Sequence, residues 1–421
     1  MFRCGIFQLL ITTSVLCVLA TQAAAQTNGP PRAAGWNNPQ LYVLLEENSH
    51  TLVVARKLAA DHRLPLDLDG LFLPSLGKRA FIANLSERGS HGGQTIAALM
   101  KQLRLDPRIA VADVVSEFSV LGGPAKGTST PRAGADLGDP YAPLQHAHIT
   151  TSVTQSQRIA SGAGVKVAVI DTGVDAKHVD LENQIVQHLN FVGPEQDSTA
   201  TEFHATAVAG IIGAEANNGV GVIGVAPGSR LFVLRACVET NPGSSRGKCS
   251  SLALARALDW AIVNEMQLIN MSVQGQDDEL VSRLIQKAVS EGIVVVAATD
   301  LTNGQLAFPA KLAEVIAVSD QESNSLVGLA AHSQRIFIAP GEEILTTLPN
   351  DTYDFVTGAS FAAAHVTGII ALIMEKAPSL TPAEITALLR DSVRVINWGI
   401  IVDSCSALAL LGGDINCRSF R

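Results

Sequence analysis

The chain has 421 residues, of which 47% are hydrophobic and 16% charged, and its formal net charge is -9. This length exceeds one ordinary domain, so we expect two folded units together with processing segments. An acidic chain lacks the basic surface that phosphate binding requires, which argues against a nucleic-acid partner.

The N-terminus predicts a cleavable export signal over residues 1–25. Arg3 precedes a mostly apolar stretch, and the run Ala23-Ala24-Ala25 offers small residues to signal peptidase. A membrane anchor is the alternative, but the apolar stretch is short and interrupted by polar residues. We therefore expect a secreted protein, extracellular or periplasmic, with no membrane contact once the signal is removed.

Residues 26–40 contain three prolines and are expected to form a flexible lead-in. Residues 41–121 then alternate short strand and helix patterns. Strand patterns cover Leu41 to Leu45, Lys78 to Leu85 and Ala110 to Val120, and helical patterns cover Thr51 to His62 and Gly93 to Leu103. This order is typical of a small α+β sandwich of the ferredoxin-like type. Residues 122–138 are rich in Gly, Pro, Ser and Thr and predict an exposed linker that a protease can cut.

Residues 139–421 carry a different pattern, in which nearly continuous apolar runs alternate with helical stretches. The apolar runs are Lys166 to Ile170, Leu231 to Leu234, Leu268 to Met271, Ile293 to Ala297 and Val315 to Val318. The helical stretches are His204 to Ile212, Leu252 to Asn264 and Glu279 to Glu291. Such strands predict an α/β domain with a parallel sheet covered by helices on both faces. Active sites of these sheets form beyond the carboxyl ends of the strands, where Asp171, Ser272 and Asp300 fall.

Four cysteines remain after the predicted signal, as two close pairs: Cys237 with Cys249, and Cys405 with Cys417. Four cysteines allow three connectivities, and an exported chain favours disulfides, so local pairing is the simplest interpretation. Free buried thiols are the alternative. A zinc site is not favoured, because no CxxC or His-rich spacing accompanies these residues.

Three polar residues suggest a nucleophilic site. Asp171 ends a buried strand, His204 begins an apolar helix, and Ser360 begins another apolar helix. A serine hydroxyl is a weak nucleophile at neutral pH, so it needs an adjacent base, and that base needs a group that fixes its tautomer. Each residue alone is more often a helix cap or a core residue, but the order Asp, His, Ser makes the combination specific.

These residues lie in segments that resemble subtilisin-type peptidases over roughly residues 140–390. The segments are Val167 to Gly173, His204 to Gly210, Thr357 to Val366, Gly224 to Pro227, Ile269 to Ser272 and Phe308 to Ala310. The resemblance implies a serine endopeptidase that acts on proteins or peptides, with Asp171 as orienting group, His204 as general base and Ser360 as nucleophile. Residues 41–121 resemble the family's prodomain, which implies an intramolecular inhibitor that is cut from the enzyme within residues 122–138.

The resemblance also implies roles for residues around the substrate. Ser272, Val273 and Gln274 are expected to pair as a strand with the substrate backbone. Asp300 stands where the family carries an asparagine that donates to the oxyanion, and a carboxyl group can donate there only when it is protonated. Asn303 is the alternative donor.

A structural calcium site is a further implication of the resemblance, while catalysis would need no cofactor. Asp180, the Asn218 side chain and the carbonyl groups of residues 216, 220 and 222 would suit a hard, oxygen-preferring cation. The alternative is a turn without metal, because an Asn-Gly pair favours tight turns in any case.

Two other functions remain open. Asp300 and the Ala205 that replaces a glycine of the family pattern would suit a subtilisin-like binding or regulatory protein with weakened catalysis. A serine esterase could use the same Asp, His and Ser residues, but the segment Ser272-Val273-Gln274 favours a peptide substrate.

Overall fold

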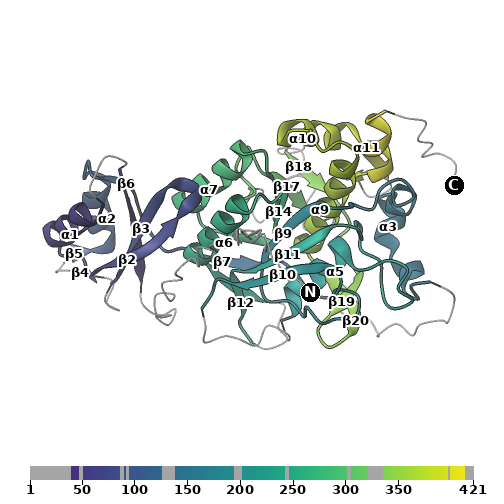
Figure 1. Ribbon diagram of the computed structural model, residues 1–421, viewed down its shortest axis with the longest axis horizontal. Coiled ribbons are helices and arrows are strands. Elements are labelled where there is room, and N and C mark those ends of the chain that lie inside the picture. The colour runs from purple at the N-terminus through teal and green to yellow at the C-terminus, as the bar shows by residue number, and fades with distance from the viewer. Residues whose placement is uncertain are drawn as a thin grey trace, which may run out of the picture.

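The computed structural model describes residues 39–46, 51–85, 90–91, 94–125, 138–193, 202–241, 246–300, 305–320, 335–396 and 399–412. The expected signal peptide, and most of the expected lead-in and linker, lie outside these residues. Two folded units lie side by side in Figure 1. We call residues 40–114 the N-terminal unit and residues 138–412 the C-terminal unit.

The N-terminal unit is a four-stranded antiparallel sheet with two helices on one face. Its sheet order is β2-β3-β1-β6, formed by β1 (Gln40–Leu45), β2 (Leu66–Leu73), β3 (Lys78–Asn84) and β6 (Ile109–Val114). The helices are α1 (Thr51–His62) and α2 (Ile96–Arg104), with the short elements η1 (Pro74–Leu76), β4 (Ser90–His91) and β5 (Gln94–Thr95) between strands. The expected α+β sandwich is therefore present.

Strand β1 shows why this sheet forms. Leu41 and Val43 pack with the two helices, whereas Tyr42 and Leu44 belong to the core that continues into the C-terminal unit. Successive side chains of a strand point to opposite faces, so a strand that is apolar throughout can be covered on both. The sequence pattern did not predict β2, because Asp67, Asp69 and Gly70 interrupt its apolar residues.

The expected strand from Ala110 to Val120 is wrong, because the chain forms two strands there. Strand β6 ends where Val115 N–H donates to Gln40 O at 2.8 Å, and Ser116 N–H then donates to Ser251 Oγ at 3.1 Å. After this change of partner, β7 (Glu117–Val120) pairs with the C-terminal unit. A continuous apolar pattern cannot show a change of sheet, because both sheets bury its residues.

The C-terminal unit contains a seven-stranded sheet whose pairings are all parallel. Its order is β10-β11-β9-β14-β16-β17-β18, formed by β9 (Lys166–Asp171), β10 (Ile185–Asn190), β11 (Arg230–Arg235), β14 (Leu268–Met271), β16 (Val294–Ala298), β17 (Ile316–Ser319) and β18 (Ile336–Ile338). The helices are α3 (His146–Thr150), α4 (Val153–Ser156), α5 (Phe203–Gly213), α6 (Ser251–Val263), α7 (Glu279–Ser290), α9 (Ala359–Lys376), α10 (Pro382–Asp391) and α11 (Ser404–Leu410), with η2 at Ala142–Leu144. This is the parallel α/β architecture that the apolar runs predicted.

Smaller sheets surround this core. One has the order β12-β13-β7-β15, formed by β12 (Cys237–Glu239), β13 (Gly247–Ser250) and β15 (Val273–Gly275) around β7. Another has the order β19-β20-β8, from β19 (Ile344–Leu348), β20 (Thr352–Thr357) and β8 (Gly123–Pro124). A hairpin joins β21 (Val393–Ile396) to β22 (Gly399–Val402). Both β7 and β8 come from the junction between the two units.

Both faces of the parallel sheet are covered. Val167 and Val169 of β9 pack into the core that contains α5 and α9, whereas Ala168 and Ile170 pack into the core that contains α6 and α7. Helix α9 is long and apolar enough to cross a membrane by length and composition, but 89% of that stretch is buried inside the protein. It is therefore the central core helix, and it begins beside the carboxyl ends of the strands.

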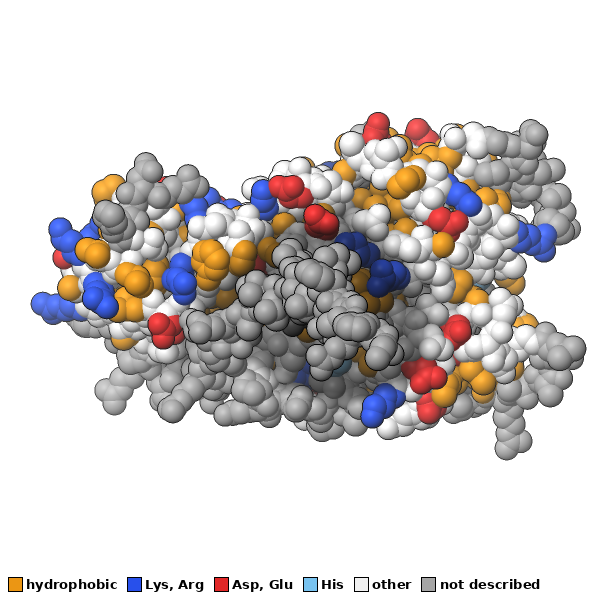
Figure 2. Space-filling model, viewed as in Figure 1, with side chains coloured by type: hydrophobic (Ala, Val, Ile, Leu, Met, Phe, Trp, Pro, Cys, Tyr) orange, Lys and Arg blue, Asp and Glu red, His pale blue; other side chains and the backbone are white. Residues whose placement is uncertain are grey.

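The N-terminal unit lies against α6 and α7, as Figure 1 shows. Tyr42 OH donates to Asp278 Oδ1 at 3.0 Å, and Asp278 caps α7. Ser75 N–H and Oγ both donate to Asp259 Oδ1, at 2.9 and 2.5 Å. Burial raises the pKa of both carboxyl groups. On the face shown in Figure 2, acidic and basic side chains are interspersed over the described parts of both units.

Candidate active site

His204 and Asp171 form a buried pair at the carboxyl edge of the parallel sheet. Nδ1 of His204 lies 2.8 Å from Oδ1 and 3.0 Å from Oδ2 of Asp171, and neither residue is exposed. Asp171 is the last residue of β9, and its Oδ1 also accepts a hydrogen bond from Thr172 N–H at 2.6 Å. A carboxylate on Nδ1 fixes the tautomer of the imidazole and leaves Nε2 as the proton acceptor.

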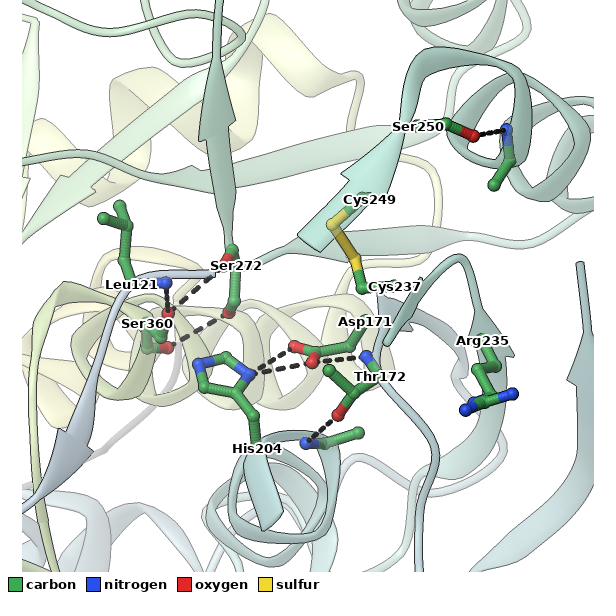
Figure 3. Close-up of a disulfide and its surroundings, with 12 residues drawn as sticks. Leu121, Asp171, Thr172, His204, Arg235, Cys237, Cys249, Ser250, Ser272 and Ser360 are labelled. Carbon is green, nitrogen blue, oxygen red and sulfur yellow. Dashed lines mark hydrogen bonds and ion pairs between the residues drawn. A yellow bond between two sulfur atoms is a disulfide. The ribbon is translucent and has the colours of Figure 1, made fainter. Parts of the chain in front are cut away.

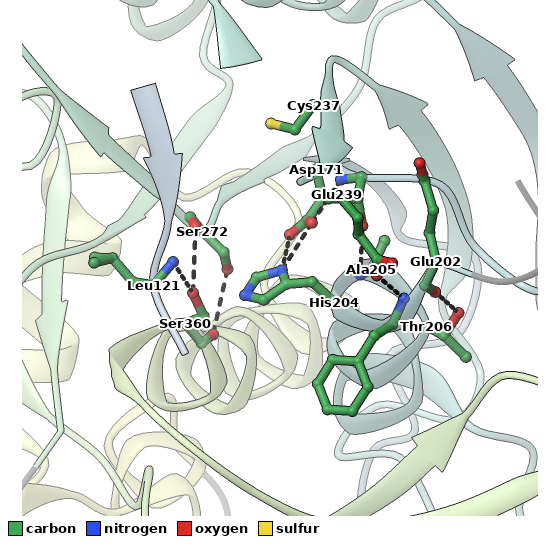
Figure 4. Close-up of polar contacts among 12 residues, drawn as sticks. Leu121, Asp171, Glu202, His204, Ala205, Thr206, Cys237, Glu239, Ser272 and Ser360 are labelled. Carbon is green, nitrogen blue, oxygen red and sulfur yellow. Dashed lines mark hydrogen bonds and ion pairs between the residues drawn. The ribbon is translucent and has the colours of Figure 1, made fainter. Parts of the chain in front are cut away.

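The second ring nitrogen of His204 is available for this role. Nε2 is buried and has no hydrogen-bond partner among the described residues. Figure 4 shows the ring between Asp171 and Ser360, with this nitrogen on the side of Ser360. Ala205 N–H donates to Thr172 Oγ1 at 3.0 Å, which ties the start of α5 to the end of β9. The structure therefore brings together the three residues that the sequence singled out.

Ser360 is the second residue of α9, and its hydrogen bonds are with two other segments. Its Oγ lies 3.2 Å from Ser272 O, to which it donates, and 3.2 Å from Leu121 N, from which it accepts. Ser360 N–H donates to Leu121 O at 2.9 Å. The carbonyl of Leu121 thus points at a backbone N–H at the start of a helix, where a developing negative charge is stabilised.

The chain's own strand β7 fills the place beside β15 that was expected to bind a substrate backbone. Val273 pairs with Val120 and Gly275 with Phe118, in antiparallel register. On its other side β7 pairs with β13, where Phe118 lies opposite Cys249. Strand β7 therefore lies as the middle strand between β13 and β15, which are the two walls of the cleft that it fills.

The chain continues past Ser360 without leaving the surface of the C-terminal unit. Gly123 pairs with Thr357 and Pro124 with Val356, and Ala125 N–H donates to Phe355 O at 2.9 Å. Residues 117–125 therefore cross the start of α9, with the peptide bond between Leu121 and Gly122 beside Ser360. The sequence pattern did not reveal this occupant, although the apolar run ending at residue 121 and the Gly-rich segment after it coincide with the crossing.

Asp300 follows β16 and is half-buried at the same edge of the sheet. Its Oδ2 accepts a hydrogen bond from Gln274 Nε2 at 2.9 Å. In this contact the carboxylate is an acceptor, whereas the expected oxyanion role requires a donor. Asn303, the alternative donor, lies outside the described residues.

A buried ion pair that the sequence analysis missed supports the His204–Asp171 pair. Arg235 Nε donates to Glu202 Oε2 at 2.8 Å, and the second Arg235 nitrogen contacts Glu202 Oε1. Glu202 also accepts from Gly173 N–H, and it stands at the N-cap of α5. Arg235 ends β11 directly opposite Asp171. A buried charge pair with these additional hydrogen bonds ties the loop after Asp171 to the helix that carries His204.

The disulfide Cys237–Cys249 joins β12 to β13, as the local pairing predicted. Figure 3 shows it near the strand ends that carry Asp171 and Ser272. The bond therefore closes the hairpin whose second strand is one wall of the cleft. Cys405, on α11, is disulfide-bonded, and its expected partner Cys417 lies outside the described residues.

Asp180 and Asn218, the expected calcium ligands, lie together. Asp180 is fully buried, its Oδ1 accepts from Asn218 Nδ2 at 2.8 Å, and its Oδ2 accepts from Val222 N–H at 3.0 Å. Burial raises the pKa of Asp180, because removal from water disfavours the charged form of the carboxyl group. A Cβ on Gly221 would lie 2.0 Å from Asp180 Oδ2, so glycine at this position leaves room for the buried carboxylate.

A hard cation fits this donor set. Rotation of the Asn218 amide by half a turn would present oxygens from both side chains, and a cation would compensate the buried carboxylate. Within the described residues no group of three or more acidic, histidine or cysteine side chains forms a metal cluster, so backbone carbonyl oxygens would supply the other ligands.

The parallel sheet, the buried His–Asp pair at its carboxyl edge and the serine at the start of the core helix define a serine hydrolase of the α/β class. Residues 162–404 match the subtilase family, Peptidase_S8. The chain is 35% identical over 234 residues to subtilisin DY of Bacillus licheniformis, covering 53% of this chain and 81% of that protein. It is 38% identical over 237 residues to a subtilisin of Bacillus pumilus, covering 53% and 82%.

The fold agrees with a solved structure. Fervidolysin from Fervidobacterium pennivorans, a keratinolytic enzyme related to subtilisin, matches with a TM-score of 0.70 at 23% identity. The match covers 92% of this chain and 63% of that one, so this chain spans less than two thirds of fervidolysin. The protein belongs to the subtilase family and is a serine endopeptidase.

Proposed function

We propose that Asp171, His204 and Ser360 hydrolyse peptide bonds through an acyl-enzyme on Ser360, and that the first bond they cut is Leu121–Gly122 of the same chain. The observation that carries the proposal is the pair of contacts between Ser360 and Leu121. Ser360 N–H donates to Leu121 O, and Leu121 N–H donates to both Ser360 Oγ and Ser272 O. A peptide bond held in this way has its carbonyl beside the nucleophile.

The chemistry requires the hydroxyl group of Ser360, which donates to Ser272 O in the structure, to turn towards the unpartnered Nε2 of His204. His204 Nε2 removes the proton of Ser360 Oγ as this oxygen attacks the carbonyl carbon of Leu121, and Asp171 stabilises the imidazolium. The oxygen of that carbonyl becomes an oxyanion and accepts from Ser360 N–H. His204 then returns the proton to the nitrogen of Gly122 as the C–N bond breaks. Water, deprotonated by the same histidine, releases Leu121 from Ser360 as a carboxylate.

Substrates would bind as β7 does, as the middle strand between β13 and β15. Phe118, three residues before Leu121, is 1% exposed, and its ring lies 5.8 Å from the Phe308 ring, centroid to centroid. Leu121 is partly buried against the core. We therefore expect protein or peptide substrates with apolar residues at these two places. An esterase would not need the backbone pairing on both sides of the cleft.

The N-terminal unit would act as an inhibitor after the cut. Strand β7, which follows this unit directly in the chain, occupies the cleft, and Tyr42 and Ser75 of the unit bond to the carboxylates of Asp278 and Asp259. These contacts involve no atom of the cut bond, so they would hold the unit in place until it is degraded. In this proposal residues 41–121 form the prodomain, residues 122–138 the linker, and residues 139–421 the peptidase domain. Residues 1–25 would direct secretion.

Calcium would be structural. Asp180, Asn218 and nearby carbonyl groups would hold it, and when bound it would compensate the buried charge of Asp180 and order the loop of residues 216–222. The catalytic residues need no help from it.

Processing of the precursor tests the main proposal. Ser360→Ala, expressed in a protease-deficient host, should retain the N-terminal unit, whereas the wild type should yield a protein that begins at Gly122 or further along the linker. Ser290→Ala is the matched control, because Ser290 lies on the exposed end of α7 and should not affect processing. A fluorophosphonate probe should label the wild type and not Ser360→Ala. Normal processing of Ser360→Ala would exclude self-cleavage, and an unlabelled wild type would favour the weakened binding protein.

A further inference from the structure

The residue directly after the proposed scissile bond lies in a slot that has room only for backbone. Gly122 has a φ of +149°, a conformation that residues with an L side chain rarely adopt. A Cβ on residue 122 would lie 2.6 Å from Phe361 Cε2 and 3.0 Å from Phe361 Cζ. Non-bonded carbon atoms prefer 3.5–4.0 Å, so the smallest side chain would already collide with the ring.

Phe361 cannot easily move away. It follows the nucleophile on α9 and is fully buried in the core that contains α5. Its ring lies 5.6 Å from the imidazole of His204, centroid to centroid. A rotation of Phe361 would therefore have to displace either core side chains or the catalytic histidine, and close-packed cores resist such shifts.

The opposite wall of the slot is formed by the backbone at Gly358. A Cβ on Gly358, which has a φ of +147°, would lie 2.4 Å from Gly122 Cα and 3.0 Å from Leu121 O. The absence of a side chain at position 358 therefore lets residues 121 and 122 approach the start of α9. The Phe361 ring then leaves no space for a side chain on residue 122. Beyond the slot, residues 123–125 pair with β20, so the restriction concerns one position.

We propose that Phe361 is a specificity-determining residue that restricts this peptidase to substrates with glycine directly after the scissile bond. The inference rests on the proposed function, because it needs Leu121–Gly122 to be the bond at Ser360. The substrate class is then peptides with an apolar residue followed by glycine, of which the chain's own junction, Phe118-Ser119-Val120-Leu121-Gly122, is one example. Phe361 acts here by its volume and takes no part in proton transfer.

Two quenched peptides test the proposal. One carries the chain's own residues 117–125, and the other is identical except for alanine in place of Gly122. The mature wild-type enzyme should cleave the glycine peptide between leucine and glycine, identified by mass spectrometry, with a kcat/KM at least about tenfold above that of the alanine peptide, the scale at which one methyl group is discriminated in a tight pocket. Phe361→Ala should reduce this ratio towards one by raising the rate on the alanine peptide.

Phe308→Ala is the matched control, because Phe308 contacts Phe118 on the other side of the bond. It should lower kcat/KM for both peptides and leave their ratio unchanged. In the precursor, Gly122→Ala should slow self-cleavage, and Phe361→Ala should restore it.

The possible failures are distinguishable. If the wild type cleaves both peptides equally at the same bond, the specificity proposal is wrong and the proposed function stands. If neither peptide is cut, or the cut falls at another bond, the placement of Leu121–Gly122 at Ser360 is wrong. If Phe361→Ala does not fold, the glycine-to-alanine ratio of the wild type still decides.

Discussion

Gln274 donates a hydrogen bond from Nε2 to Oδ2 of Asp300 at 2.9 Å, which joins the middle of β15 to the residue expected at the oxyanion. The two side chains come from different parts of the sequence, on β15 and after β16. Their contact uses Asp300 as an acceptor, and an acceptor near a developing oxyanion opposes the reaction.

Asp300→Asn should therefore raise turnover, because an amide can donate where an ionised carboxylate cannot. Loss of one such donor costs about 100- to 1,000-fold in kcat in a subtilisin, so the gain should approach but not exceed this range. The measurement is kcat on the glycine peptide, with Gln274→Ala as control for loss of the hydrogen bond alone. A decrease in kcat for Asp300→Asn would remove Asp300 from the oxyanion site and favour Asn303.

Replacement of both Cys237 and Cys249 by alanine should lower the free energy of unfolding by roughly 3 kcal/mol, the loop-entropy scale for a closure of this length. The same change should raise KM more than it lowers kcat, because β13 is a wall of the cleft and carries no catalytic group. Urea unfolding of the Ser360→Ala precursor and peptide kinetics of the mature enzyme measure the two effects.

Peptide maps without reductant should also show Cys405 bonded to Cys417, and any cross-pairing would contradict the local connectivity.

Two buried histidines predict loss of stability in acid. Burial lowers the pKa of His148 to about 3 and that of His365 to about 4, and their rings lie 6.3 Å apart, centroid to centroid. In the unfolded chain both have a pKa of about 6.5, so between these values the unfolded state binds more protons. The stability is complete above about pH 6.5 and declines as the pH falls towards the folded-state pKa values, by up to about 1.4 kcal/mol per pH unit for each histidine.

His148→Leu should flatten this decline, since leucine has a similar volume and does not titrate. The check is urea unfolding of the Ser360→Ala precursor at several values between pH 7 and pH 4. His146→Leu is the control, because His146 is exposed. An equally steep decline in His148→Leu would show that other groups cause the loss of stability at low pH.

Calcium should raise the melting temperature of the Ser360→Ala precursor, with a stabilisation of about 2.7 kcal/mol at a concentration 100 times the dissociation constant. Asp180→Asn should abolish the response, because it removes the buried carboxylate. Asp259→Asn, at the contact between the two units, is the control and should keep the response. A wild type whose melting temperature is the same in calcium and in EGTA would favour the turn without metal.

The sequence was sufficient to predict the parts of this protein that depend on local pattern. Uninterrupted apolar runs predicted the parallel sheet, since both of its faces are buried, and the helical stretches between them were confirmed as α5, α6 and α7. Asp171, His204 and Ser360 could be singled out because each follows or begins such an element. Close spacing along the chain was enough to predict the disulfide Cys237–Cys249.

Relationships between distant segments were decided only by the tertiary structure. The pairing of β7 with β13 and β15, the seating of Leu121 at Ser360 and the closeness of Phe361 to Gly122 join residues more than 100 positions apart, and no local pattern records which strand a given edge will accept. The pair of Glu202 with Arg235 was missed because no local pattern links two side chains 33 positions apart. A charged residue is expected from the sequence to lie on the solvated surface. Only the fold shows that Glu202 and Arg235 are buried beside each other as an ion pair.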